Sequence, residues 1–223
     1  MHGPVNPILR WGSTVLLAGL ALVGALAFQA AARGEEEPLP EAVVTLESLH
    51  RDPQASLGRL VRLRFQFDAE QARWNPYLTR FGSGDYRAFR VWSDEQFLWE
   101  KEQWEAPLGQ LFVRRGGVAE RALAGAPQLA RFEAIGRVRQ VLLGRPWIEL
   151  EQVRRIGDEI SESTLLHASR AVLAMEEAHW AMAREHLERA LVGSMPPTAR
   201  EELNVLRAIT LDPPRSSDPA TGR

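Results

Sequence analysis

The chain has 223 residues, a formal net charge of -2 and no cysteine. Its apolar content of 45% and charged content of 25% are those of an ordinary folded protein and argue against global disorder. Without cysteine, the sequence excludes disulfides, thiolate nucleophiles, cysteine-ligated zinc, iron–sulfur clusters and a lipid-modified cysteine.

Charge is distributed unevenly along the chain. Residues 58–156 carry 17 Lys and Arg against 12 Asp and Glu, whereas residues 157–211 carry five Arg against nine acidic residues. A basic block beside an acidic block suggests that the two dock on each other, or that the basic block faces an anionic surface. The plainer alternative is an ordinary solvated surface.

Residues 13–32, STVLLAGLALVGALAFQAAA, form an uncharged apolar run. As a helix, a run of this length reaches roughly 30 Å, the thickness of the hydrocarbon core of a bilayer. Arg10 precedes the run and favours an N-terminus inside with the remaining chain outside, although Arg33 on the far side opposes this. We therefore expect residues 1–33 to be a signal-anchor that crosses the cell membrane once, with the C-terminal domain outside the cytoplasm.

The alternative is a secretory signal peptide. The small residues Ala30 and Ala32 fit a cleavage motif at the end of the apolar run. Cleavage there would give a secreted or periplasmic protein with no membrane anchor.

Five segments that follow an acidic linker and lead-in (34–57) have the features of half-buried strands. The clearest is RLVRLRFQF, in which Val61, Leu63, Phe65 and Phe67 share one face. The predicted strands are residues 59–67, 87–92, 109–117, 131–143 and 147–156. We expect two short helices between them, at 94–105, where Ser93 and Gln96 form a capping box, and at 118–127.

The order of these elements is strand, strand, strand, helix, strand, strand. With LGRLVRLRF as the opening strand and a closing hairpin about Gly144-Arg145-Pro146, residues 58–156 resemble the OB-fold, a five-stranded Greek-key barrel. The resemblance makes the helix at 94–105 an insertion. An unrelated five-stranded sheet with two helices is the alternative.

From residue 157 to residue 211 the apolar period changes to that of amphipathic helices, which we expect at 161–178, 179–197 and 198–209. Ala171, Ala183, Leu187 and Ala190 give the segment a resemblance to the tetratricopeptide repeat, a helix–turn–helix unit of about 34 residues. The predicted fold class is therefore α+β: a transmembrane helix, an OB-like barrel with one or two short helices, and a C-terminal antiparallel helical hairpin. Residues 212–223 read as a disordered tail.

A single repeat of this kind cannot bury its own apolar face, because about three stacked repeats are normally needed. The helices at 162–209 must therefore dock on the barrel, associate with a second copy of the chain, or bind a protein partner.

The histidines do not suggest a metal site. His179 and His186 are seven residues apart on one predicted helix, which separates them by about 10.5 Å, too far to ligate one zinc ion. His50 and His167 have no partner at ligand spacing. We expect no bound metal and no cofactor.

Catalysis is not indicated either. Glu149 and Glu151 lie two apart on the last predicted strand, where an acid/base pair is conceivable but a solvated outer face is the usual reading. The stretch FGSGDY lacks the residues of a phosphate loop, and no nucleophile elbow is present. The sequence predicts a protein that is not an enzyme and has no catalytic residues.

OB barrels bind sugars or single-stranded nucleic acid through the face around strands two and three. Carried onto this chain, the resemblance makes the candidate ligand-binding residues Arg87, Arg90, Trp92, Phe112 and Arg114. Placement outside the cytoplasm argues against nucleic acid. Alternatively, the helices cover this face and Trp92 packs beneath them.

The expected function is that of a non-catalytic, membrane-anchored extracytoplasmic protein that acts through protein–protein contacts at the cell envelope. The first alternative is a barrel that binds an oligosaccharide or single-stranded nucleic acid through strands two and three. The second is a hydrolase with an unrecognised site.

Overall fold

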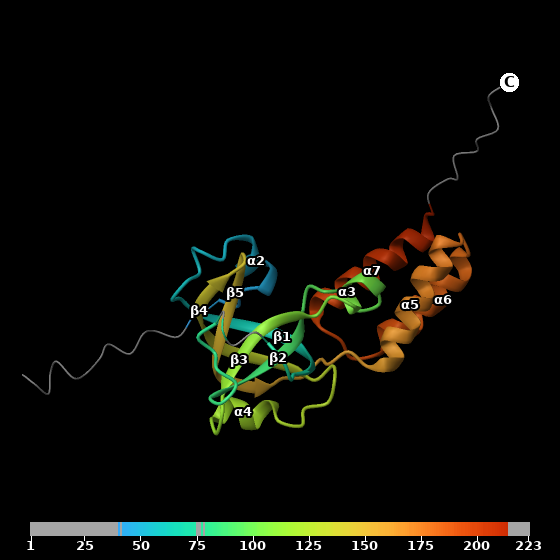
Figure 1. Cartoon of the computed structure of the whole chain (residues 1–223). Coiled ribbons are helices and arrows are strands. Elements are labelled where there is room, and N and C mark those ends of the chain that lie inside the picture. The colour runs from blue at the N-terminus through green and yellow to red at the C-terminus, as the bar shows by residue number, and fades with distance from the viewer. Residues whose placement is uncertain (1–39, 41, 75–76, 78, 214–223) are drawn as a thin grey trace, which may run out of the picture. The chain divides into compact units, whose positions relative to one another are not determined.

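The structure is a computed structural model that describes residues 40, 42–74, 77 and 79–213 (Figure 1). The predicted membrane segment at 13–32 and most of the predicted tail at 212–223 lie outside these residues. Across the part of the chain that is described, no helix combines the length and apolarity needed to cross a bilayer.

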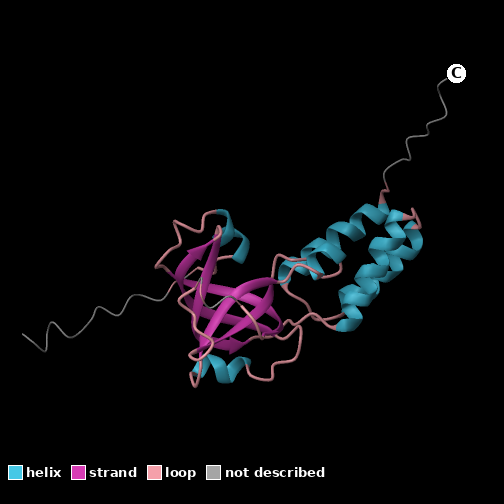
Figure 2. Cartoon of the chain, viewed as in Figure 1, coloured by secondary structure: helices cyan, strands magenta, loops and turns pink. Residues whose placement is uncertain are grey.

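Five strands form a closed barrel in the order β1-β2-β3-β5-β4. The strands are β1 (Leu60–Gln71), β2 (Tyr86–Ser93), β3 (Leu108–Arg114), β4 (Arg131–Leu142) and β5 (Arg145–Arg155). The strands, drawn in magenta in Figure 2, are antiparallel to their neighbours except for the parallel pair β3–β5, and β4 pairs with both β1 and β5. The predicted α+β class and five-stranded barrel are confirmed.

The interior of the barrel is built from the alternation that the sequence predicts. Val61, Leu63, Phe65 and Phe67 all belong to the buried core of the barrel. The ring of Phe65 lies against Phe132 of β4, with centroids 5.9 Å apart. Side chains of successive residues point to opposite faces of a strand, so one face fills the barrel while Arg and Gln side chains occupy the other.

The lead-in contains a helix that the sequence analysis missed, α2 (Leu46–Arg51). The hydroxyl of Thr45 caps it by accepting a hydrogen bond from the Ser48 N–H at 3.0 Å. Leu46 and Leu49 are buried in the barrel core, so the helix covers one opening of the barrel's apolar interior. The later short helix, α4 (Val118–Leu123), is found where it was predicted.

The helix predicted at 94–105 is wrong in extent, because only α3 (Lys101–Trp104) is helical. One half of the capping box exists: the Ser93 N–H donates to Gln96 Oε1 at 3.0 Å. The turn that follows does not propagate into a helix. Leu98 and Trp99 are consecutive and both are buried, which an irregular segment accommodates more readily than a short amphipathic helix.

The closing hairpin turns one position earlier than predicted. Leu143 and Gly144 occupy the turn with φ values of 51° and 70°. Two consecutive residues with positive φ are the signature of the two-residue type I′ turn, whose twist matches that of the strands. Arg145 and Pro146 therefore already belong to β5, where they pair with Leu142 and Val141.

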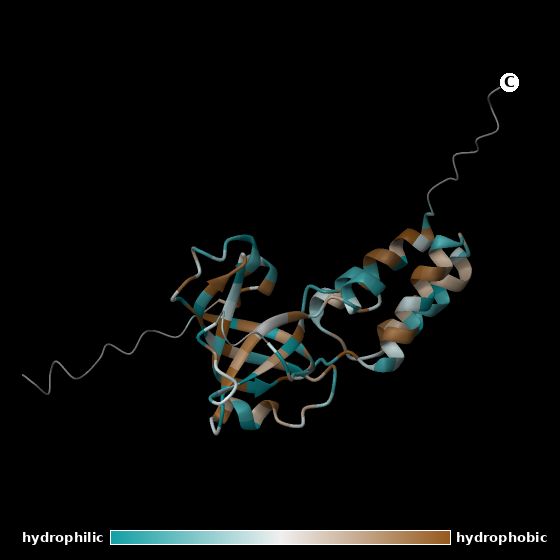
Figure 3. Cartoon of the chain, viewed as in Figure 1, coloured by the Kyte–Doolittle hydropathy of each residue, from teal (hydrophilic) through white to brown (hydrophobic). Residues whose placement is uncertain are grey.

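The C-terminal segment forms three helices, α5 (Glu162–Glu176), α6 (Trp180–Val192) and α7 (Pro197–Leu211). Each has the mixture of apolar and hydrophilic residues expected of an amphipathic helix (Figure 3). Ala168, Ala171, Ala183 and Ala190 are buried, and such small side chains allow close packing between helices. The predicted helices are confirmed, while their kinship to a repeat family remains a proposal.

A second apolar core, separate from the barrel interior, joins residues of the barrel region to the helices. Trp92 and Leu129 from the barrel region, with Leu98 and Trp99, pack in the same cluster as residues of α5, α6 and α7. The helices therefore dock on the barrel region, which is one of the three arrangements that the sequence leaves open.

Gly136 on β4 offers a test of barrel packing. A Cβ at this position would lie 2.8 Å from the backbone oxygen of Glu149 and 2.9 Å from a side-chain carbon of Ile148. Because backbone cannot move aside cheaply, we expect Gly136→Ala to lower the free energy of unfolding by about 1–3 kcal/mol in urea titrations. Gly157→Ala, where nothing lies within 4 Å, is the control and should change it little. Equal stabilities for the two variants would contradict this packing.

Candidate binding surfaces

Trp92, expected to stack on a ligand, is buried with 1% of its surface exposed. Its indole ring stacks on Trp104, with centroids 4.7 Å apart, and its Nε1–H donates to the Trp104 carbonyl oxygen at 3.1 Å. The ring thus presents no face to solvent, and the arrangement is the alternative in which the insertion and the helices cover it.

The two arginines predicted on β2 are held by carboxylates. Arg87 lies 2.9 Å from Glu120 and 3.6 Å from Glu70, and Arg90 lies 2.8 Å from Asp68. The contact of Arg87 Nε with Glu120 and that of Arg90 with Asp68 Oδ2 are close ion pairs that lack hydrogen-bond geometry. Their charges are thereby partly compensated inside the protein.

Phe112 and Arg114 lie on β3 and differ in exposure. The Phe112 ring is 1% exposed and stacks on Phe81 at 4.1 Å and on Trp147 at 5.0 Å. The Arg114 side chain is 67% exposed, and its guanidinium lies over the ring of Tyr86. The five predicted residues therefore do not form one continuous aromatic and cationic surface.

Arg114 instead belongs to a small cationic pocket of about 320 Å³. The pocket is lined by Arg80, Phe81, Tyr86, Arg114, Arg139 and Glu149. Burial, and next the negative charge of Glu149, raise the pKa of the Tyr86 hydroxyl. That hydroxyl donates to Glu149 Oε1 at 3.3 Å and accepts from Arg114 at 3.0 Å.

Glu149 was expected on a solvated face, and that expectation is wrong. Its side chain is 9% exposed, and Arg139 Nε lies 2.8 Å from Glu149 Oε2. Burial of a carboxylate is possible here because Arg139, Arg114 and Tyr86 all bond to it. The sequence missed this because these partners come from three other strands.

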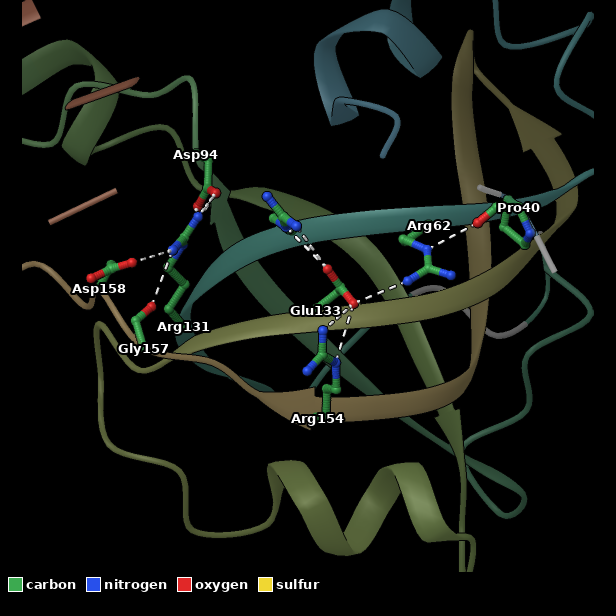
Figure 4. A network of polar contacts seen from close by, with 9 residues as sticks. Pro40, Arg62, Asp94, Arg131, Glu133, Arg154, Gly157 and Asp158 are labelled. Atoms are coloured by element: carbon green, nitrogen blue, oxygen red, sulfur yellow. Dashed lines mark hydrogen bonds and ion pairs between the residues drawn. The ribbon is translucent and has the colours of Figure 1, made fainter. Parts of the chain in front are cut away.

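A second buried carboxylate, Glu133 on β4, is surrounded by three arginines (Figure 4). Arg154 lies 2.7 Å away, Arg64 3.1 Å and Arg62 3.3 Å. Burial alone would raise the pKa of Glu133, but hydrogen bonds from Arg154 and Arg64 outweigh it and hold the pKa below the ordinary value. Arg62 also donates to the Pro40 carbonyl oxygen at 3.0 Å, so the same guanidinium holds the lead-in segment.

The third buried ion pair joins Asp94, after β2, to Arg131 at the start of β4 (Figure 4). Arg131 Nε lies 3.1 Å from each Asp94 oxygen, and another guanidinium nitrogen donates to the Gly157 carbonyl at 3.1 Å. The Asp94 carbonyl accepts a hydrogen bond from the Thr198 hydroxyl of α7 at 2.6 Å. The pair therefore lies where β2, β4 and α7 meet.

An apolar cavity of about 750 Å³ lies between residues 98–104 and α5. We name it the α5 groove; its lining is Leu98, Trp99, Glu100, Lys101, Glu102, Trp104, Leu165, Leu166, Ser169, Val172, Leu173 and Glu176. Leu166 and Leu173 line it although they are 50% and 59% exposed. The Ser169 hydroxyl donates to the Trp99 carbonyl at 3.3 Å and ties the two walls together.

The polar residues of the α5 groove are mostly acidic: Glu100, Glu102 and Glu176 outnumber Lys101. The buried Nε1–H of Trp99 has no hydrogen-bond acceptor among the described residues. Sequence reasoning missed the groove because it forms between an irregular segment and a helix about 70 residues later.

The histidines are arranged differently from the expectation. His167 of α5 and His186 of α6 approach with their Nδ1 atoms 3.3 Å apart, so His167 does have a partner. His179 lies beside Glu177 instead, at 3.1 Å. Within residues 40, 42–74, 77 and 79–213, no group of three or more His, Asp or Glu side chains converges on a common metal position.

Comparisons with known proteins give no family. No protein-family model and no curated protein matches this chain. Among solved structures, one match is to a protein assigned as an aspartyl-tRNA synthetase from Leishmania major Friedlin, with 9% sequence identity and a TM-score of 0.35. The match covers 60% of this chain and 25% of that one. A likeness at this level carries no conclusion about activity.

Glu133 provides a test of the buried charges. Glu133→Gln removes the negative charge that three arginines share, and we expect about 2 kcal/mol less stability at pH 7, since those arginines are partly solvated. The folded pKa of Glu133 lies below its ordinary value of 4.5, so its stabilising contribution is present above that value and is lost as pH falls through the folded pKa. The difference between wild type and variant should therefore shrink in acid.

Glu105→Gln is the matched control, because Glu105 is 62% exposed and lies 4.0 Å from Lys101. An exposed pair of this kind contributes about 0–1 kcal/mol. Urea unfolding from pH 7 to pH 3 measures both variants, and equal losses would refute the role assigned to Glu133.

Proposed function

We propose that this protein is a non-catalytic, membrane-anchored protein of the cell envelope that works through protein–protein contact, with the described domain outside the cytoplasm. We further propose that the barrel is OB-like and that the helices are tetratricopeptide-like. The observation that carries the contact function is the α5 groove, a cavity of about 750 Å³ along which the large apolar side chains of Leu166 and Leu173 stay exposed.

The occupant that fits the groove best is an amphipathic segment of a partner protein with leucine-like anchors and flanking Lys or Arg. Leu166 and Leu173 are seven residues apart, so they lie two turns apart on one face of α5 and leave apolar surface uncovered. Trp104, which is half-buried, supplies aromatic surface opposite, and aromatic residues dominate the energetics of interfaces. The excess of Glu over Lys in the lining favours basic flanks.

A second copy of the chain is the competing occupant. The basic balance of residues 58–156 would complement the acidic helices of another copy. The oligomeric state is therefore measured together with peptide binding.

The test uses the full-length protein in detergent and two labelled synthetic peptides. Both peptides carry leucine at i, i+3, i+4 and i+7, one with Lys and the other with Glu at the remaining positions. We expect the Lys peptide to bind, with fluorescence anisotropy as the measurement, and the Glu peptide to bind at least about tenfold more weakly, because of the acidic rim.

The variant Leu166→Asp with Leu173→Asp should weaken binding of the Lys peptide by about tenfold or more, since it puts charge on the apolar wall. Val192→Asp is the control, because Val192 is 89% exposed on α6 and is not in the groove lining. Equal binding of both peptides, or equal binding by both variants, would refute this function. Self-association in light scattering that the double variant abolishes would instead identify a second copy as the occupant.

A second candidate function is the binding of an oligosaccharide or single-stranded nucleic acid by the barrel. The cationic pocket favours it, because Arg80, Arg114 and Arg139 surround Tyr86 with a single carboxylate, Glu149, among the lining residues. Arg114→Ala should reduce retention on a sulfated polysaccharide column, since the exposed guanidinium would contact the anion directly. Arg170→Ala, outside this pocket, is the control, and unchanged elution of Arg114→Ala would exclude the pocket.

A further inference from the structure

The pair formed by His167 and His186 links two helices on the side of α5 away from the groove. The Nδ1 atoms are 3.3 Å apart, and the ring centroids are 5.4 Å apart with planes inclined by 30°. Both residues are half-buried, so solvent reaches the site. Without a metal, one ring must carry its proton on Nδ1 and donate it to the bare Nδ1 of the other.

We propose that His167 and His186 bind one transition-metal dication of the Zn²⁺ class between α5 and α6. Imidazole nitrogens ligate zinc at about 2.0–2.1 Å, and two such ligands of a tetrahedral ion are therefore about 3.3 Å apart. This is the separation found between the two Nδ1 atoms, so an ion can be accommodated with little movement of either helix. The inference is independent of the function proposed for the groove.

Binding requires a change of tautomer rather than a chemical reaction. The ring that carries its proton on Nδ1 must carry it on Nε2 instead, so that both Nδ1 lone pairs face the ion; between neutral rings no net proton is released. The described residues supply no third ligand at this position, so water completes the coordination. Such a site is exchangeable, and it selects metals that prefer nitrogen over Mg²⁺ and Ca²⁺, which prefer oxygen.

Charged side chains near the histidine pair also affect metal binding. Two positively charged side chains, Arg170 and Arg189, lie close enough to His167 to act on it electrostatically. These arginines oppose a dication, although Arg189 lies 2.6 Å from Glu185 and is partly neutralised. With two protein ligands and two nearby arginines, the site should bind metal more weakly than a four-ligand structural site does.

The experiment uses full-length protein in detergent, purified without a polyhistidine tag and stripped with a chelator. Thermal unfolding and isothermal titration calorimetry are measured at pH 7.5 with Zn²⁺, Cu²⁺, Ni²⁺ and Mg²⁺. We expect one ion per chain and a rise in the melting temperature. Cu²⁺ should bind more tightly than either Ni²⁺ or Zn²⁺, and Mg²⁺ should have no effect.

His167→Asn and His186→Asn should each weaken binding by at least about tenfold, because each removes one of two ligands. His179→Asn is the matched control, since His179 lies on the same hairpin but pairs with Glu177. Circular dichroism of the metal-free variants checks that they fold. Absence of binding to the wild type, retention of binding by either ligand variant, or equal loss in His179→Asn would overturn the proposal.

Discussion

The described structure depends on the contact at Trp92, where an apolar surface of the barrel region and an apolar surface of the C-terminal helices cover each other. On β2, Phe89 and Val91 fill the barrel, and Trp92 lies instead in the cluster shared with the helices. The helices also need such a contact, because a single hairpin with one further helix leaves one apolar face uncovered. Trp104 stacks on Trp92 and its carbonyl accepts the indole N–H, so the large aromatic surface is buried without an unsatisfied donor.

The buried ion pair next to Trp92 gives this apolar contact a defined geometry. Apolar packing is non-directional, so it does not by itself fix how a helix meets a strand. Asp94 follows Trp92 by two residues, and its carboxylate is bonded by Arg131 while its carbonyl is bonded by Thr198. Because an unpaired buried guanidinium is costly, any arrangement that separates these groups is penalised. The pair thus favours the one arrangement of β2, β4 and α7 in which these groups stay bonded to one another.

The features that could be predicted from the sequence are those set by interactions between residues close together in the chain. The strand faces with Val61 and Phe65 and the three C-terminal helices were predictable, because period-2 and period-3.6 patterns are local. The groove was not, since Leu98 and Trp99 are buried by helices much later in the chain. The same reason hid Glu149, whose arginines come from other strands, and the partner of His167, which depends on how α5 packs on α6. Of the five residues predicted to bind a ligand on strands two and three, Trp92 and Phe112 have no exposed face, because residues distant in the sequence cover them.

Packing holds α5 on both of its faces, and this bears on both proposed sites. Toward α6, Ala171 and Ala183 are fully buried, so the helices have little freedom to shift, and an ion at His167 and His186 would reinforce contacts that are already close. Toward the groove, Leu98 and Trp99 of the opposite wall are buried, and the Trp99 carbonyl accepts a hydrogen bond from the Ser169 hydroxyl. Since two ligands are coupled only when each alters the equilibrium that the other senses, metal and partner should bind this protein independently of each other.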